Sequence, residues 1–253
     1  MGVKPLNTDI EKAVGALLNS KRTTAFTGAG ISVESGIPPF RGENGLWNRF
    51  NPEFLDINYF MDYPEKSWKL IKDIFYDYFG KAKPNAAHTA LGKLEGMGLL
   101  HSIITQNIDG LHQQGGSNNV YEFHGNSRNL VCVKCGNIYK AVDYNLNTLP
   151  PVCKSCGGLL KPDFVFFGEP IPEPAQSNSF AEVKNADVFL IIGTTGEIMP
   201  ASIIPVEASK NNKTIIEINT HKSNYTNSIA DIFLQGKATQ IMQKLLTNIL
   251  KRR

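Results

Sequence analysis

The chain has 253 residues, 42% of them hydrophobic, which suits one large folded domain or a domain carrying a smaller insertion. Its formal net charge of +3 is mild and does not by itself indicate a nucleic-acid-binding protein. No stretch approaches the ~20 apolar residues of a membrane-spanning helix, and residues 1–21 lack the apolar core of a signal peptide. We therefore expect a cytoplasmic protein with no membrane segment and no specific nucleic-acid partner.

The hydrophobic pattern predicts alternating helices and strands along most of the chain. Apolar residues at helical spacing predict a helix over residues 9–20, and the run that follows predicts a strand over 23–27. Further strands are predicted over 101–105, 188–192, 214–218 and 232–234, and further helices over 86–97, 200–210 and 238–250. Long apolar runs are typical of strands buried on both faces of a parallel sheet. The predicted fold class is therefore α/β, with a Rossmann-like parallel sheet and helices on both faces.

Two stretches interrupt this alternation. Residues 43–83 are rich in aromatic and acidic residues and have a largely helical pattern, whereas residues 130–160 contain all four cysteines. We therefore predict a Rossmann-like domain built from residues 1–42, 84–129 and 161–253. A helical insertion (43–83) and a zinc-ribbon insertion (130–160) would form a second, smaller domain.

A glycine-rich turn follows the first predicted strand. Its sequence, Gly28-Ala29-Gly30, places backbone N–H groups after a strand, where α/β proteins commonly bind phosphate. The turn lacks the third glycine of the dehydrogenase pattern, because Val33 stands at that position. By itself, the pattern favours a simple tight turn over a dinucleotide site.

The four cysteines form two Cys-x-x-Cys pairs separated by seventeen residues. Cys132 and Cys135 make the first pair, and Cys153 and Cys156 make the second. This spacing is typical of a zinc ribbon, in which four thiolates close a tetrahedral site. A closed site leaves no position for a reacting water, so the predicted Zn²⁺ is structural rather than catalytic.

Polar residues that could bind a ligand or take part in catalysis lie at two other places. Asn107 and Asp109 come just after the second predicted strand, where open α/β sheets bind ligands, although an Asx-rich turn would look the same. His124 lies in a Phe-His-Gly-Asn segment just before the first cysteine. Histidine titrates near neutral pH and can act as a general base, but a lone histidine is more often a hydrogen-bonded structural residue.

Taken in order, these motifs resemble those of the sirtuins, the NAD-dependent protein-lysine deacylases, in a bacterial or archaeal-like form. The matching segments also include Pro162–Glu169 and Gly193–Thr195, and the resemblance extends from about residue 25 to residue 238. It implies a reaction in which the acyl group of an acyl-lysine is transferred to the ADP-ribose of NAD. The products would be free lysine, nicotinamide and O-acyl-ADP-ribose, with His124 as the base and a zinc ion that takes no part.

The resemblance also assigns residues to a cofactor site and a substrate site. Asn107 and Asp109 would act at the nicotinamide and ribose of NAD and count with His124 as catalytic. The cofactor residues implied are Gly28, Ala29, Gly30, Ser32, Ile37, Phe40, Arg41, Gln106, Asn107, Ile108, Asp109, Gly193, Thr194, Thr195, Asn219 and Ala238. The substrate residues implied are Val165, Phe167, Gly168, Glu169, Ile198 and Met199. An acyl-lysine-bearing protein or peptide would bind along these last segments as an extended strand.

The helical insertion bears on the choice of acyl group. Sirtuins that remove succinyl or malonyl groups carry a Tyr-x-x-Arg pair there. Alignment on Trp68 places Ile71 and Ile74 at these positions, and a second possible alignment places Lys72 and Phe75 there. An acidic acyl group would lose its hydration without gaining a partner. We therefore expect an apolar acyl group, acetyl or longer, in preference to succinyl or malonyl.

Two other functions stay open at this point. A mono-ADP-ribosyltransferase would use the same NAD site with a different acceptor, and it would form ADP-ribosylated protein instead of O-acyl-ADP-ribose. A non-catalytic module would use the zinc ribbon and the cleft only to bind partners. The presence of His124, Asn107 and Asp109 argues against such a module, because binding alone does not need them.

Overall fold

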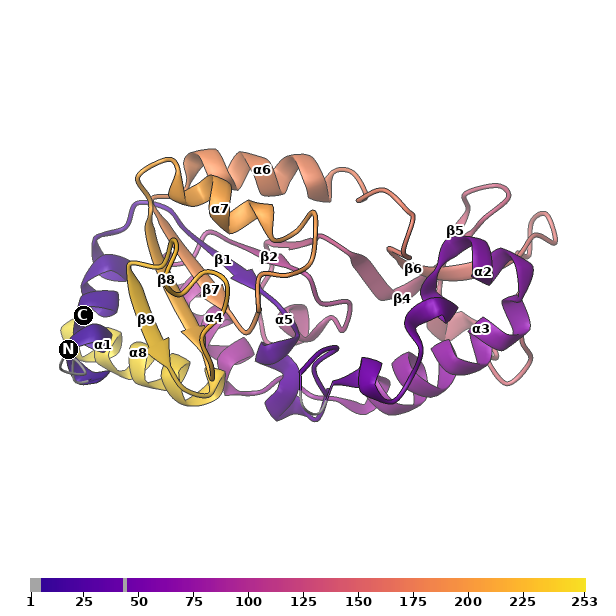
Figure 1. Ribbon diagram of the computed structural model, residues 1–253, viewed down its shortest axis with the longest axis horizontal. Coiled ribbons are helices and arrows are strands. Elements are labelled where there is room, and N and C mark those ends of the chain that lie inside the picture. The colour runs from indigo at the N-terminus through magenta and orange to yellow at the C-terminus, as the bar shows by residue number, and fades with distance from the viewer. Residues whose placement is uncertain (1–5, 43–44) are drawn as a thin grey trace.

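A six-stranded sheet organises the computed structural model, which describes residues 6–42 and 45–253 (Figure 1). Its strand order is β3-β2-β1-β7-β8-β9, and every neighbouring pair is parallel. The strands are β1 (Thr23–Thr27), β2 (Ser102–Thr105), β3 (Val120–Glu122), β7 (Val188–Ile192), β8 (Thr214–Asn219) and β9 (Ile232–Gln235). All five predicted strands are present, whereas the short β3 was not predicted.

The strand order fixes where a ligand can bind. Counted along the chain within this sheet alone, the order is 3-2-1-4-5-6, which is that of dinucleotide-binding doubly wound folds. The order reverses between β1 and β7, and ligands of such sheets bind outside the carboxyl ends of the strands at this point. The predicted fold class is thus confirmed.

Helices cover both faces of the sheet (Figure 1). One face packs against α1 (Leu6–Asn19), α4 (Ala86–Gly96) and α8 (Ala238–Arg252), and the other packs against α6 (Ala175–Asn185) and α7 (Ile203–Ser209). Successive strand residues point to opposite faces, so Ala25 and Leu190 join the first core while Phe26 and Ile191 join the second.

The predicted helices at 9–20, 86–97 and 238–250 are confirmed by α1, α4 and α8. The helix predicted over 200–210 is shorter, because α7 spans only Ile203–Ser209, and α6 was not predicted. Among the described residues, no helix is both long and apolar enough to cross a membrane.

A second group of elements packs around a separate hydrophobic core. It contains α2 (Ile57–Asp62), α3 (Pro64–Ile71) with a following π-helical turn (Lys72–Tyr78), and a three-stranded antiparallel sheet in the order β5-β4-β6. The strands are β4 (Gly125–Cys132), β5 (Ile138–Lys140) and β6 (Leu160–Phe164). We call residues 46–82 and 125–166 the small module, which lies at the right of Figure 1.

The helical and cysteine-containing segments are joined through this core. Trp68 of α3 is fully buried and donates a hydrogen bond from its indole N–H to the Leu160 carbonyl of β6 (2.8 Å). The three-stranded sheet extends beyond the predicted 130–160 segment at both ends, because β4 begins immediately after His124. Residues 1–5 of the predicted main domain and residues 43–44 of the predicted helical insertion lie outside the described residues.

Candidate functional site

The turn after β1 meets the turn after β7 at the switch point of the sheet. The Gly30 N–H donates to the Gly193 carbonyl (2.8 Å), and a β-carbon on Gly30 would lie only 2.6 Å from the Gly193 Cα atom. Gly193 has a φ of +64°, and a β-carbon there would lie 2.4 Å from the Ile31 nitrogen. Only glycine allows two backbones to approach this closely, so these glycines let the two turns pack directly against each other at the carboxyl edge. Residues 29–35 beyond Gly28 form a 3₁₀ helix rather than an open loop.

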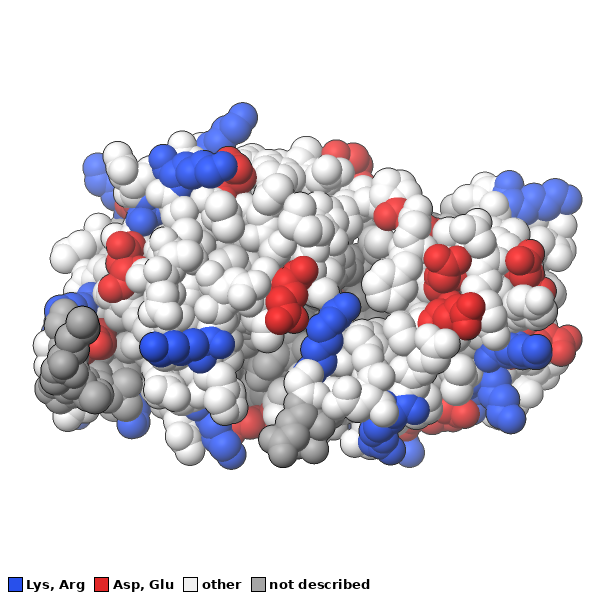
Figure 2. Space-filling model, viewed as in Figure 1, with Lys and Arg blue, Asp and Glu red and all other residues white. Residues whose placement is uncertain are grey.

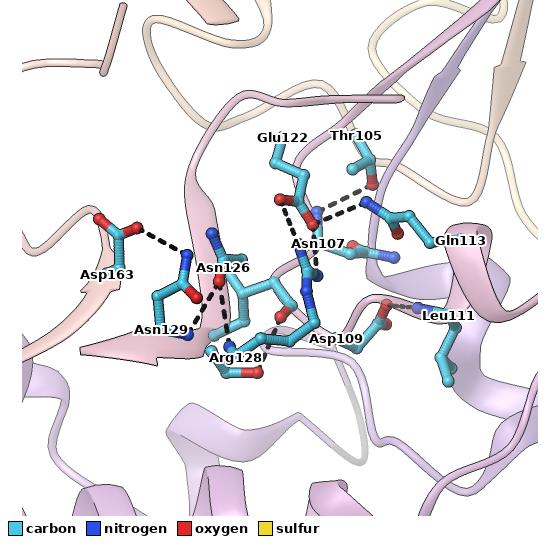
Figure 3. A network of polar contacts seen from close by, with 12 residues as sticks. Thr105, Asn107, Asp109, Leu111, Gln113, Glu122, Asn126, Arg128, Asn129 and Asp163 are labelled. Atoms are coloured by element: carbon cyan, nitrogen blue, oxygen red, sulfur yellow. Dashed lines mark hydrogen bonds and ion pairs between the residues drawn. The ribbon is translucent and has the colours of Figure 1, made fainter. Parts of the chain in front are cut away.

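A buried polar network joins this turn to the end of β2. The Asn107 amide donates to the Gly28 carbonyl (3.2 Å) and to Ser32 Oγ (3.3 Å). Ser32 Oγ in turn donates to one oxygen of Asp109 (2.7 Å), whose other oxygen accepts the Leu111 N–H (2.9 Å; Figure 3). Burial raises the pKa of Asp109, although these two hydrogen bonds oppose the rise. The structure therefore brings together Gly28, Ser32, Asn107 and Asp109, four residues that the sequence resemblance assigns to the cofactor site.

Arg128 lies beside the turn that follows β2 (Figure 3). Arg128 of β4 makes two hydrogen bonds of 2.7 Å to the carboxylate of Glu122 in β3. Its guanidinium lies so close to Gly110 that a β-carbon there would be 2.8 Å from Nη1. The positive charge of Arg128 also lowers the pKa of Asp109, against the effect of burial.

The ends of β7 and β8 complete the carboxyl edge. Thr194 accepts a hydrogen bond from Gln106 at its hydroxyl (3.1 Å) and another from Asn219 at its carbonyl (3.0 Å). Three strand ends are therefore linked through one threonine. Ala238 is the first residue of α8. The next residue, Thr239, donates its N–H and its hydroxyl proton to the carboxylate of Glu34 (3.2 and 2.7 Å), which ties the start of α8 to the 3₁₀ helix after β1.

His124 lies between the sheet and the small module. Its Nδ1 atom is 3.1 Å from the Gln106 carbonyl oxygen. Because a carbonyl can only accept, Nδ1 carries the proton and Nε2 is left as a basic acceptor. Burial lowers the pKa of His124, and the bond to Gln106 offsets this only in part. The imidazole is therefore neutral near pH 7, which suits a general base.

The segment after β6 bears the predicted substrate residues. The Val165 N–H donates to the His124 carbonyl (2.9 Å), so this segment and the histidine are directly connected. The Phe167 N–H donates to the Leu55 carbonyl (2.8 Å), and the side chain of Phe167 is 47% exposed. One carboxylate oxygen of Glu169 accepts the Phe166 N–H (2.8 Å) within the same segment, and the Glu169 side chain is 24% exposed.

The other predicted substrate segment is more exposed. Met199 is 63% exposed, and the Ile198 carbonyl accepts the Ser202 N–H (2.8 Å). Within the described part of the chain, no hydrogen bond joins Ile198 or Met199 to the Phe164–Glu169 segment.

Three of the implied cofactor residues, Ile37, Phe40 and Arg41, differ in their surroundings. Ile37 is buried, and the Phe40 ring packs 5.2 Å from the Trp47 ring. Arg41 is exposed and lines, with Phe167, an open groove of about 860 Å³ on the small module. The rest of its lining is Asn51, Pro52, Glu53, Asp56, Tyr59, Asp62 and Tyr63. Figure 2 shows acidic side chains over α2, where part of this lining lies.

The four cysteine sulfurs lie within 4.8 Å of one another. The Cys132–Cys156 and Cys135–Cys153 sulfur distances are 3.6 and 3.7 Å. A tetrahedral zinc ion with Zn–S bonds of about 2.3 Å requires sulfur separations of about 3.8 Å. The four thiolates therefore fit one structural Zn²⁺.

Three residues of the site region were missed from the sequence. The first is His88, which is fully buried, and this burial lowers its pKa to about 4. Its Nδ1 accepts the Asn85 N–H (3.2 Å), and its Nε2 lies 3.5 Å from Ser32 Oγ. An Asn-x-x-His helix start is a recognisable capping pattern that could have identified it. The Tyr139 hydroxyl lies 3.1 Å from Cys153 Sγ, and it makes the largest contribution among the hydrogen bonds that lower the pKa of Cys153 to about 6. Lys161 is buried within β6, and no sequence pattern indicated this.

Comparison with known proteins gives one consistent result. The model of the Sir2 family matches residues 28–200. The NAD-dependent protein deacylase 2 of Pyrobaculum aerophilum is 42% identical over 93% of this chain and 94% of its own length. A solved Sir2 homolog–NAD complex is 40% identical, with a TM-score of 0.89 over 96% of this chain and 94% of its own. A solved Sir2–p53 peptide–NAD⁺ complex is 31% identical, with a TM-score of 0.87 over 94% and 98%.

Proposed function

Because the chain belongs to the Sir2 family and is an NAD-dependent protein deacylase, we propose that it removes apolar acyl groups in preference to succinyl and malonyl groups. The observation that carries this proposal is the pair of isoleucines in the small module. Ile71 and Ile74 are 0% and 4% exposed and belong to the same hydrophobic core as Phe164 and Phe166. Neither isoleucine offers a hydrogen bond or a positive charge to an acyl carboxylate. In the second alignment the cation, Lys72, is already paired with Asp77.

The size of the preference follows from desolvation. Burying even a neutral polar group without a partner costs about 1–3 kcal/mol in proteins, and a carboxylate costs more. Since about 1.4 kcal/mol corresponds to a factor of ten, succinyl-lysine is expected to react at least about tenfold more slowly than acetyl-lysine.

We propose the following roles for the residues of the carboxyl edge. NAD would supply the ribosyl carbon that the acyl carbonyl oxygen attacks as nicotinamide leaves, and the ribose hydroxyl that finally carries the acyl group. The turn around Gly28 and Gly30 leaves room for the pyrophosphate, while Asn107 and Asp109 hold the nicotinamide end. His124 accepts a ribose hydroxyl proton at Nε2, and the ribose oxygen then attacks the acyl carbon. One water molecule completes the release of the lysine amine, so acyl-lysine, NAD and water give free lysine, nicotinamide and O-acyl-ADP-ribose.

We further propose that the acyl-lysine protein or peptide binds as an extended strand along Val165–Glu169, with Ile198 and Met199 on its other side. Two observations support this. The backbone of Phe167 already pairs with residues 55–57 as in a parallel bridge, so the segment has strand geometry. The Sir2–p53 peptide–NAD⁺ complex also shows that a protein with the same fold binds a peptide.

Mass spectrometry of NAD reactions with acetyl-, longer acyl-, succinyl- and malonyl-lysine peptides tests the proposal. We expect NAD-dependent loss of apolar acyl groups with formation of O-acyl-ADP-ribose, and no product from His124→Ala. His101→Ala is the matched control, because His101 immediately precedes β2 at the opposite end of the sheet and is exposed. Equal rates for succinyl and acetyl peptides would contradict the acyl preference. ADP-ribosylated protein without acyl loss would instead support the transferase function.

A further inference from the structure

Lys161 is a buried lysine that the proposed reaction does not use. Its side chain is only 7% exposed, although it lies one residue into β6. An ammonium group has three protons and must satisfy each of them when it is removed from water. Lys161 Nζ has three acceptors, which are the carbonyls of Pro162 and Phe164 (both 2.9 Å) and a carboxylate oxygen of Glu169 (3.1 Å). The Phe166 ring covers the group at 4.7 Å.

Two of these acceptors, Phe164 and Glu169, lie at the two ends of one segment. Phe164 ends β6, and Glu169 follows the turn at Gly168, which has a φ of +92°. The same Glu169 oxygen that faces Lys161 also accepts the Phe166 N–H (2.8 Å). The ammonium thus fixes the start, the middle and the end of the Phe164–Glu169 segment.

We propose that Lys161 and Glu169 are positioning residues that hold this segment in the shape needed to bind the acyl-lysine strand. The inference rests on the proposed substrate site, because Val165 and Phe167 lie between the two fixed ends. The Lys161 ammonium is not free to touch a substrate, since its three protons are already used, and the Glu169 oxygen that faces it is occupied as well. Their effect therefore passes through the backbone of the segment.

A change at this pair should affect the peptide more than NAD. The Gly28, Asn107 and Thr194 contacts of the NAD edge involve neither Lys161 nor Glu169. Removal of one member of a buried, hydrogen-bonded charge pair leaves the other unpaired, and the structure then rearranges to hydrate it. Since Lys161 and Glu169 contact each other and the backbone of the Phe164–Glu169 segment, this rearrangement would displace the peptide-binding edge.

Steady-state kinetics of the full-length zinc-containing protein with an acetyl-lysine peptide test the inference. We expect Lys161→Met to raise the peptide KM by about tenfold or more, while the NAD KM changes by less than about twofold. Lys161→Arg keeps the charge and should restore most of the peptide affinity. Lys140→Met on β5 is the control, because Lys140 is exposed in the same three-stranded sheet and should leave both constants unchanged.

Glu169→Gln provides a second test that does not depend on how methionine packs. It preserves side-chain size and removes only the charge, so the peptide KM should rise again without the NAD KM. Thermal unfolding and zinc content of each variant establish that the fold is intact. An unchanged peptide KM in both variants, or equal increases in both constants, would overturn the inference. Failure of the wild-type protein to remove any acyl group would instead overturn the proposed function.

Discussion

Replacing Tyr139 by phenylalanine removes one hydroxyl from the surroundings of the predicted zinc ion. This hydroxyl lies 3.1 Å from Cys153 Sγ and 2.9 Å from Ser155 Oγ. It can donate its proton to the sulfur while it accepts one from Ser155. In this position it stabilises the thiolate form of Cys153, which is the form that binds metal.

The expected loss of zinc affinity follows from the hydrogen bond between Tyr139 and Cys153. Loss of a hydrogen bond to a metal ligand typically lowers metal affinity by about 10- to 100-fold. Ser155 stays close to the same place and can supply part of the lost stabilisation. We therefore expect Tyr139→Phe to weaken zinc binding toward the lower end of this range, by about tenfold.

Competition with a chromophoric zinc chelator measures this affinity directly, without reference to enzyme activity. Tyr144→Phe is the matched control, because its ring packs 5.5 Å from that of Tyr139. In the described residues, no hydrogen bond joins the Tyr144 hydroxyl to a cysteine sulfur. Equal zinc affinity in wild type and Tyr139→Phe, or the same loss in both variants, would refute the argument.

Three further predictions concern the main sheet. His124→Ala should lower kcat by about 10²- to 10⁴-fold, and because burial lowers the pKa of His124, the acidic limb of the wild-type kcat/KM profile should lie below about pH 6.5. The buried His88, with its pKa lowered to about 4, binds a proton near pH 6.5 only when the chain unfolds. Its contribution to stability should therefore fall by about 3 kcal/mol as the pH is lowered from 6.5 to 4, and chemical unfolding of His88→Gln should show a correspondingly weaker pH dependence. Gly30→Ala should lower the free energy of unfolding by about 1–3 kcal/mol and raise the NAD KM, because its β-carbon would lie 2.6 Å from Gly193 Cα. Gly15→Ala is the control: its β-carbon would have no atom within 4 Å, so it should neither destabilise the protein nor change the NAD KM.

The parts of the site that could be predicted lie close to strong local signals. The cysteine pairs have a spacing that itself specifies a tetrahedral site. Gly28 follows β1 directly and Asn107 comes two residues after the end of β2, and parallel strands place all such positions on one edge of the sheet. The contact between the two turns, in contrast, needed the strand order, because Gly28 and Gly193 are far apart in the chain.

Other elements carry too little pattern to be predicted. β3 has only three residues, all half-buried, so it shows neither an apolar run nor an alternation. α6 is mostly polar, and its few buried positions do not form a continuous apolar stripe. Burial of Lys161 depends on Glu169 folding back across a glycine turn, which no local spacing encodes.

His124 is bonded to both the main sheet and the segment that follows β6. Its ring nitrogen is oriented by the Gln106 carbonyl at the end of β2, which belongs to the edge that would bind NAD. Its own carbonyl accepts the Val165 N–H from the segment that would bind the acyl-lysine. His124 is therefore held from both sides: the Gln106 carbonyl sets the tautomer of its ring, and the bond from Val165 helps to position its backbone. A rearrangement of either segment should then reduce kcat through His124, even where the altered residue never meets the reacting atoms.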